Sequence, residues 1–318
     1  KLPEIDEATQ AIFDNGYLFE SYAEQLFEDV KRIEREEDDF NSSFIKTREA
    51  IDGGVEFISQ GGFKTDKLLC FCDILKRVGE NEFDLYEIKS ATDIRPEYLH
   101  DLAFQKEVLE QNGYKINKFF VIHVNNNYVR NGEVKPEEIC KIQEVTEKVN
   151  AASSATKVNI QKALKVIDSK ICPDITPANA KSGCIYEWLA IYKELAELEE
   201  YSIYHLCSPN AEKIAKLETL GIKKIHEIPD SFDLNDKQRR QYSATKSGEI
   251  FADKLRIKSF LDSLKFPLYF LDYETLAGLV PYFDGHGPYM QVPFQYSLHV
   301  LREPDGKVEH LEYLHCEN

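Results

Sequence analysis

The sequence lacks a long apolar run: no stretch of its 318 residues approaches the ~18 uninterrupted apolar residues of a membrane span. It begins with Lys1-Leu2-Pro3, without a Met or the apolar core of a secretory signal, so we expect the natural start upstream and no export. None of the seven cysteines forms a Cys-x-x-Cys pair, and the odd count favours reduced thiols. We therefore expect a cytoplasmic protein without disulfides or membrane contact.

Positive charge is also scarce, since 39 Lys and Arg face 56 Asp and Glu and the formal net charge is -17. This balance argues against a protein that coats nucleic acid by bulk electrostatic attraction, although a local basic patch can still hold a backbone. The one concentrated basic cluster consists of Lys237, Arg239, Arg240 and Lys246. Its alternatives are a nucleic-acid contact and a solvated helix face.

The composition is otherwise that of a globular protein, with 42% hydrophobic and 30% charged residues and a length that suits about two domains. The most informative stretch is a predicted hairpin, formed by a buried strand over residues 68–75 that carries Asp73, a turn, and a second strand over residues 83–88. Glu87 and Lys89 are two residues apart, so both side chains leave one face of their strand. The pattern predicts two carboxylates and an ammonium in one space.

Two carboxylates beside one ammonium suit a divalent metal, Mg²⁺ or Mn²⁺. Magnesium prefers one or two carboxylates, several waters and substrate phosphate, and it can generate hydroxide while neutralising charge on a phosphodiester. In this arrangement Asp73 and Glu87 bind the metal, and Lys89 orients the attacking water or stabilises the developing charge. The alternative is a plain cross-strand ion pair between Lys89 and a carboxylate.

The order Asp, then Glu-x-Lys, resembles the PD-(D/E)xK nuclease superfamily, in its RecB-like branch that also contains the CRISPR adaptation exonucleases. In that family the helix after the Lys strand carries a Gln, and Gln105 falls in register on an otherwise apolar helix face. The resemblance implies that Asp73, Glu87, Lys89 and Gln105 are the catalytic residues of a metal-dependent nuclease. Several relatives place a Tyr where this chain has Leu109, so that contact to substrate is not expected here.

Neighbouring segments extend the resemblance. Amphipathic spacing over residues 4–31 predicts two helices broken at Asn15-Gly16, and the Gly16 segment looks like the early RecB-like helix that reaches the metal. Glu20 is therefore a candidate third metal ligand, or else a surface residue of an acidic helix. A strand over residues 118–124 completes β-β-α-β, the order of the nuclease core.

Two further patterns concern the surroundings of this core. The glycine pairs at 53–54 and 61–62 are expected to bracket a strand over residues 55–58. A helical period over residues 136–169, with little Gly or Pro, predicts one or two long helices that wrap the core.

The later sequence resembles a bacterial family of unknown function that joins a RecB-like nuclease to a DnaQ-like exonuclease. In that family a Cys cluster follows the helices and implies an iron–sulfur site. Here Cys172 and Cys184 are loosely spaced, and Ala190 stands where a further thiolate would be expected. We therefore do not expect an intact cluster, because buried free cysteines are the ordinary case.

Residues 217–225 resemble a helix-hairpin-helix, in which a glycine turn and nearby lysines grip phosphates without reading bases. The candidate nucleic-acid-binding residues are Gly221, Lys223, Lys224, Arg239 and Arg240. The alternative is a helical linker that stops at the glycine.

Residues 268–275 predict a buried strand that ends in Asp272-x-Glu274. With FLDYET, PYFDGHGPY and PFQYSLH in this order, the segment resembles the start of a DnaQ-like (DEDD) exonuclease of the ribonuclease H fold. The resemblance implies that Asp272 and Glu274 are metal ligands. The remaining acidic residues and His of that family would lie beyond Asn318, so we expect a sheet with an open edge and no exonuclease activity from this segment.

The expected fold class is α/β (α+β), with a restriction-endonuclease-like core over residues 1–170, a helical linker over 171–255 and a truncated DnaQ-like domain over 256–318. The expected function is hydrolysis of phosphodiester bonds in DNA, or alternatively RNA, in repair, recombination or defence. A catalytically decayed nucleic-acid-binding or scaffold protein of the same fold is the alternative. Oligomeric state and cleavage polarity stay open.

Overall fold

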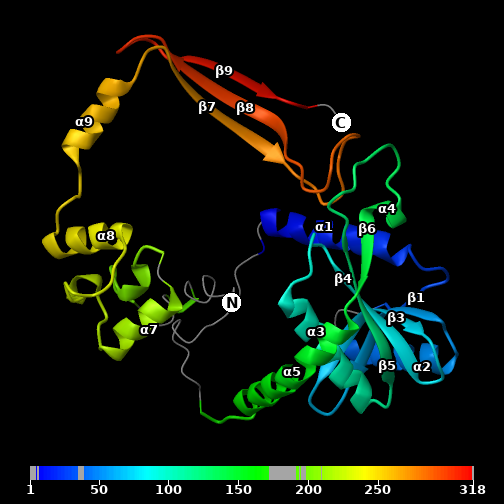
Figure 1. The fold of residues 1–318 in the computed structure, drawn as a ribbon. Helices are drawn as coiled ribbons and strands as arrows, with labels where there is room; N and C mark the ends of the chain where they lie inside the picture. Colours follow the sequence, from blue (N-terminus) through cyan, green and yellow to red (C-terminus); the bar gives the residue numbers. More distant parts are fainter. Residues whose placement is uncertain are drawn as a thin grey trace. The chain divides into compact units, whose positions relative to one another are not determined.

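The computed structural model describes residues 5, 7–34, 39–171, 191–192, 194, 198–208 and 210–316. These residues form an α/β fold with one mixed six-stranded sheet and one three-stranded sheet (Figure 1). Contacts divide the chain into two units, one with residues 1–167 and 269–318 and one with residues 168–268. The C-terminal strands therefore belong with the first unit by contact, where the sequence suggested a separate domain from residue 256.

The large sheet has its strands in chain order: β1 (Lys31–Arg32), β2 (Phe57–Lys64), β3 (Leu69–Arg77), β4 (Glu82–Lys89), β5 (Lys115–Val124) and β6 (Cys140–Glu144). Strands β2, β3 and β4 form an antiparallel meander, whereas β5 joins β4 in parallel after helix α3 (Pro96–Gln111). The predicted hairpin and the β-β-α-β order are thereby confirmed.

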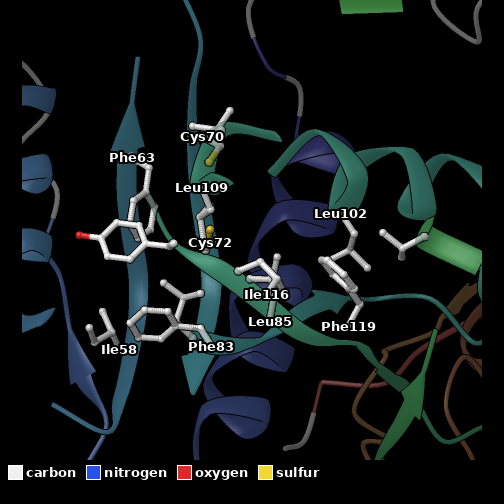
Figure 2. Packing of buried hydrophobic residues seen from close by; sticks show 14 of the residues in the cluster. Ile58, Phe63, Cys70, Cys72, Phe83, Leu85, Leu102, Leu109, Ile116 and Phe119 are labelled. Atoms are coloured by element: carbon white, nitrogen blue, oxygen red, sulfur yellow. The ribbon is translucent and has the colours of Figure 1, made fainter. Parts of the chain in front are cut away.

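Helices cover both faces of this sheet. One core cluster joins the sheet to α2 (Phe40–Asp52), α3 and α5 (Thr146–Ile167), and α5 packs along α3 (Figure 1). Figure 2 shows Leu102 and Leu109 of α3 lying over strand residues such as Cys72 and Leu85. On the other face, α1 (Glu7–Glu24) contributes Phe19 to a second cluster. The site residues therefore lie on a sheet held from both sides.

Helix α1 is continuous through Asn15-Gly16, so the prediction of two helices is wrong. A glycine inside a helix costs only about 1 kcal/mol relative to alanine. Burial of an aromatic side chain such as Phe19, which is fully buried, contributes roughly 1.5–3 kcal/mol. Packing on the sheet therefore outweighs the local break signal.

Strand β2 begins later than predicted and runs through Gly61-Gly62, so these glycines do not bracket a strand over residues 55–58. A Cβ on Gly62 would lie 2.9 Å from a ring carbon of Phe71 and 3.0 Å from one of Phe44. The glycine is needed because aromatic rings occupy the space of a side chain, not because the chain turns there.

The prediction of only helices over residues 136–169 is also wrong. A single helical turn, α4 (Pro136–Ile139), is followed by strand β6, and only then does the long helix α5 begin. Strand β6 pairs with the edge of β5 from Phe120 to Val124. Pairing of residues 140–144 with the edge of β5 therefore outweighs the weak helical pattern of this segment.

The second unit is a small helical module. It contains α7 (Ala211–Thr219), α8 (Asp236–Ser247), α9 (Lys254–Ser263) and the 3₁₀ turns η2 (Ile203–His205) and η3 (Ile225–Glu227). Its core includes Leu217, Ile225 and Tyr242. No residue of α9 is buried.

The three-stranded sheet has the order β7 (Leu268–Leu276), β8 (Val292–Leu301), β9 (Glu309–Leu314). Adjacent residues of β7 point to opposite faces, and Tyr269 and Phe270 are 62% and 57% exposed. The prediction that β7 is a buried strand is therefore wrong for the part of the chain that the structure describes. Among the described residues, β7 is an outer strand of this sheet.

Candidate active site

Glu87 lies at the centre of a buried polar cluster on β4. Its side chain is 6% exposed, and Lys89 Nζ lies 2.6 Å from Glu87 Oε1. From α3, Gln105 Nε2 donates to Glu87 Oε2 at 2.7 Å, and Asp101 Oδ2 accepts from Lys89 Nζ at 2.9 Å. The two-residue spacing on β4 and the register of α3 thus bring Glu87, Lys89 and Gln105 together as the sequence predicted.

Asp73 joins this cluster from β3. The register that pairs Ile74 with Tyr86 sets Asp73 opposite Glu87. Asp73 Oδ2 accepts a hydrogen bond from the backbone N–H of Ile88 at 2.7 Å. The side-chain carboxylate thus replaces the backbone acceptor that the neighbouring strand would otherwise supply to this N–H. Asp73 and Glu87 therefore approach each other across neighbouring strands.

Gln60 on β2 also belongs to the site, although the sequence did not predict it. It lies opposite Asp73, because Ser59 pairs with Ile74 and Gly61 with Cys72. Its side-chain Nε2 donates to Asp73 Oδ1 at 3.2 Å and to Glu20 Oε1 at 2.9 Å. The signal in the sequence was a polar residue directly before a glycine pair within an apolar strand.

Glu20 reaches the cluster from α1, on the opposite face of the sheet from α3. Besides Gln60, its Oε1 accepts from both terminal nitrogens of Arg32 at 3.2 Å. Glu20, Asp73 and Lys89 line a common pocket of about 300 Å³, whose remaining lining comes from α1 and the end of β4. A larger hollow of about 520 Å³ between β2 and α5 contains none of the expected site residues.

Burial makes the acids of this site hard to ionise. Desolvation, with a smaller contribution from Asp73, raises the pKa of Glu87 to about 8, although Lys89 opposes the shift. Desolvation raises the pKa of Asp73 to about 6, and Glu20 adds to the increase while the Ile88 N–H and Lys89 oppose it. The pKa of Lys89 is raised, because attraction to Glu87 and Asp101 together exceeds the desolvation cost. The ammonium group of Lys89 therefore balances only part of the negative charge that Asp73 and Glu87 carry when both are ionised.

This imbalance fits a divalent cation. Two buried carboxylates with raised pKa values gain from a shared positive charge, and oxygen donors are the ligands that Mg²⁺ and Mn²⁺ accept. Gln105 Oε1 is buried and has no hydrogen-bond partner among the described residues, which leaves one further polar atom for water at the site. Within the described residues no group of three or more His, Cys, Asp or Glu forms a metal cage. Magnesium needs only one or two carboxylates, so Asp73 and Glu87 are a sufficient protein contribution.

The neighbouring residues of α3 and β5 are structural. Leu109, where several relatives of the resembled family place a Tyr, is fully buried in the core. His123 pairs with Lys89 across β5 and β4 and is 3% exposed, and its Nε2 has no hydrogen-bond partner in the part of the chain that the structure describes. Neither side chain reaches the pocket lining.

The loop between β7 and β8 packs beside the site. Tyr289 Oη donates to the carbonyl of Ser90, the residue after Lys89, at 2.7 Å. Arg130 donates to the carbonyl oxygens of Pro281 and Tyr282 at 2.8 and 3.1 Å. No pattern in the sequence indicated that this segment contacts the first unit's core.

The basic candidates of the second unit do not form an open phosphate cradle. The backbone N–H groups of Lys223 and Lys224 donate to the Glu227 carboxylate at 3.1 and 3.0 Å. Gly221 does adopt the left-handed conformation, with φ +74°. The donors that a helix-hairpin-helix would offer to phosphate are thus satisfied within the chain.

Arg239 and Arg240 make internal bonds as well. Arg239 donates to the carbonyl oxygens of Asp230 and Phe232, and Arg240 donates to that of Asp236. These contacts agree with the alternative of a solvated helical element.

The remaining expected metal residues lie apart from the cluster on β3 and β4. Asp272 and Glu274 are exposed on β7, two residues apart on one face but inside the strand rather than at its end. Cys172 and Cys184, the positions relevant to an iron–sulfur cluster, lie outside the described residues. The described cysteines are free thiols: Cys70, Cys72, Cys140, Cys207 and Cys316.

Comparison with known proteins adds one match. The sequence model of a family described as a domain of unknown function (DUF2779) matches residues 269–318, which include all but the first residue of β7, together with β8, β9 and the loop beside the site. No curated protein and no solved structure matches the chain. No helix among the described residues is long and apolar enough to cross a membrane.

Proposed function

We propose that this chain is a metal-dependent nuclease that hydrolyses phosphodiester bonds in DNA. The observation that carries the proposal is the shared environment of Asp73, Glu87 and Lys89, in which two buried acids with raised pKa values lie beside one ammonium. Perturbed acids next to a cation in a pocket are typical of catalytic sites. The resemblance to RecB-like nucleases supports the same residues.

Each residue has a role that follows from its contacts. Asp73 and Glu87 would hold Mg²⁺ or Mn²⁺, which supplies an activated water and neutralises phosphate charge when bound. Gln105 fixes the orientation of Glu87 through its hydrogen bond, and Asp101 holds Lys89 at the mouth of the site. Lys89 would stabilise charge on the phosphate oxygens. Such an enzyme would act in the cytoplasm, in repair, recombination or defence.

A second candidate function is a decayed nuclease that binds nucleic acid or serves as a scaffold. The observation that favours it is the pairing of Lys89 with both Glu87 and Asp101, because this network is also a self-sufficient structural ion pair. A decayed site would keep the fold and the ion pair but would not need a cation.

The test is a cleavage assay on end-labelled single-stranded DNA, double-stranded DNA and RNA, with Mg²⁺ or Mn²⁺ and with EDTA as the control. The proposal predicts cleavage that EDTA abolishes and that the Lys89→Met variant loses, because this variant keeps the length of the side chain and removes its charge. Binding without cleavage in both metals would favour the decayed alternative.

A further inference from the structure

Gln60 occupies a conformation that a non-glycine residue rarely adopts in a strand. Its φ is +54°, within the left-handed region, and its side chain belongs to a residue that is only 6% exposed. Such backbone strain persists where the surroundings compensate for it, and it concentrates at functional sites. The compensation here is electrostatic, because the buried amide faces two carboxylates.

The amide of Gln60 connects two carboxylates that otherwise repel. Its single Nε2 group donates to Glu20 Oε1 at 2.9 Å and to Asp73 Oδ1 at 3.2 Å. Only the NH₂ end of the amide can serve two ionised carboxylates, since these groups accept and do not donate. Each acid has a second anchor: Arg32 for Glu20 and the Ile88 backbone for Asp73.

We infer that Gln60 is a positioning residue that takes the place of a divalent cation in the metal-free protein: it holds Glu20 and Asp73 together and releases their oxygens when the cation binds. This inference rests on the proposed function for the location of the metal. It favours the metal-binding alternative for Glu20 over a surface role, and it adds that the site is already assembled before metal arrives.

The inference has a thermodynamic consequence. If the amide bonds to Glu20 and Asp73 exist only in the metal-free state, their removal destabilises that state alone and leaves the metal-bound state unchanged. Cation binding must then become tighter by the same free energy. Two hydrogen bonds to charged groups correspond to at least about tenfold in affinity.

The experiment is calorimetric titration of Mn²⁺ into EDTA-stripped, full-length protein. Gln60→Met keeps the length of the side chain without its donors, and we expect it to bind Mn²⁺ at least about tenfold more tightly than wild type. Gln111→Met is the matched control, because Gln111 also donates to a carboxylate, that of Glu107, outside the site. This control should leave Mn²⁺ affinity unchanged.

A double-mutant cycle identifies the partner of the amide. In a Glu20→Gln background, Gln60→Met should raise Mn²⁺ affinity by clearly less than in wild type, because one of its two carboxylates is gone. Equal gains in both backgrounds would contradict the assignment of Glu20.

A second variant keeps the inference testable if Gln60→Met does not fold. Gln60→Glu places a third carboxylate beside Glu20 and Asp73, and its melting temperature should depend more steeply on Mn²⁺ than that of wild type. A Gln60 variant that stays unfolded at saturating Mn²⁺ would overturn the inference, since the metal-bound state should not need the amide.

Unchanged or weaker Mn²⁺ binding in both Gln60 variants, or no Mn²⁺ binding by wild type, would also overturn the inference. Tighter binding without DNA cleavage supports the inference and rejects the proposed function. Cleavage with unchanged Mn²⁺ affinity in the variants rejects the inference alone.

Discussion

At the scale of single residues, Glu87 depends on donors from two different elements. Lys89 contacts one of its oxygens and Gln105 the other, and the carboxylate has almost no access to water. A buried carboxylate that loses a donor is costly, because the remaining partner cannot solvate it alone.

The Gln105→Ala variant should therefore lose roughly 2–4 kcal/mol of unfolding free energy, from the lost bond to a charged group and the cavity that remains. Gln111→Ala on the same helix is the control, because Gln111 is exposed and should cost less than about 0.5 kcal/mol. Urea denaturation measures both. Equal losses would contradict the role given to Gln105.

The raised pKa values of Asp73 and Glu87 predict a pH dependence of the metal-free protein. Groups whose pKa is raised on folding contribute stability below their unfolded values, 3.8 and 4.5, and lose it as the pH rises through about 6 and about 8. In EDTA, unfolding free energy should thus fall by roughly 1–3 kcal/mol more between pH 5 and pH 9 in wild type than in Glu87→Gln. Parallel pH profiles of the two proteins would contradict this electrostatic description.

The sequence predicted part of this site for a clear physical reason. Strand alternation places Glu87 and Lys89 on one face, and helical spacing together with the resemblance to RecB-like nucleases indicated Gln105. Gln60 could not be found in this way. Cys72 and Leu75 pack in one core cluster whereas Ile74 packs in the other, so regular alternation fails around Asp73, opposite the left-handed Gln60.

At the level of helices and strands, Gly62 and Gly16 differ in the space that is available for a side chain. Gly62 in β2 lies against the rings of Phe71 and Phe44, whereas the nearest atom to a Cβ on Gly16 in α1 is Ser90 Oγ at 4.0 Å. Both residues looked alike in sequence, as local breaks. Only the packing against another element distinguishes them.

The Gly62→Ala variant should lose roughly 1–3 kcal/mol, because its Cβ would force the aromatic rings apart. Gly16→Ala should gain up to about 1 kcal/mol, because alanine stabilises a continuous helix and meets no close contact. Thermal unfolding of the pair tests the single-helix structure of α1. Destabilisation by Gly16→Ala would instead favour a break at this position.

At the scale of the whole molecule, the first unit combines segments distant in sequence. The loop that precedes β8 buries Leu279 in the same cluster as Phe19 of α1, and Arg130 binds its carbonyl oxygens. The boundary at residue 256 was placed from sequence similarity, which does not reveal contacts made by a loop. The segment matched by the family of unknown function thus includes part of the surroundings of the candidate site.

The Arg130→Ala variant should loosen this loop. We expect faster amide hydrogen exchange over residues 278–290, with protection of the central strands unchanged. Arg302→Ala is the control, because Arg302 pairs with Glu309 within the β8–β9 hairpin. Similar exchange in the loop of both variants would indicate that Arg130 does not anchor it.

We propose that nuclease chemistry belongs to the Asp73 site and not to the Asp272 strand. The most direct measurement compares Asp73→Ala with Asp272→Ala in one Mn²⁺-dependent DNA-cleavage assay, with circular dichroism to verify folding. We expect that Asp73→Ala abolishes cleavage and that Asp272→Ala, whose carboxylate is exposed on β7, retains wild-type rates. Loss of cleavage only in Asp272→Ala would reject this assignment and move the active site to the three-stranded sheet.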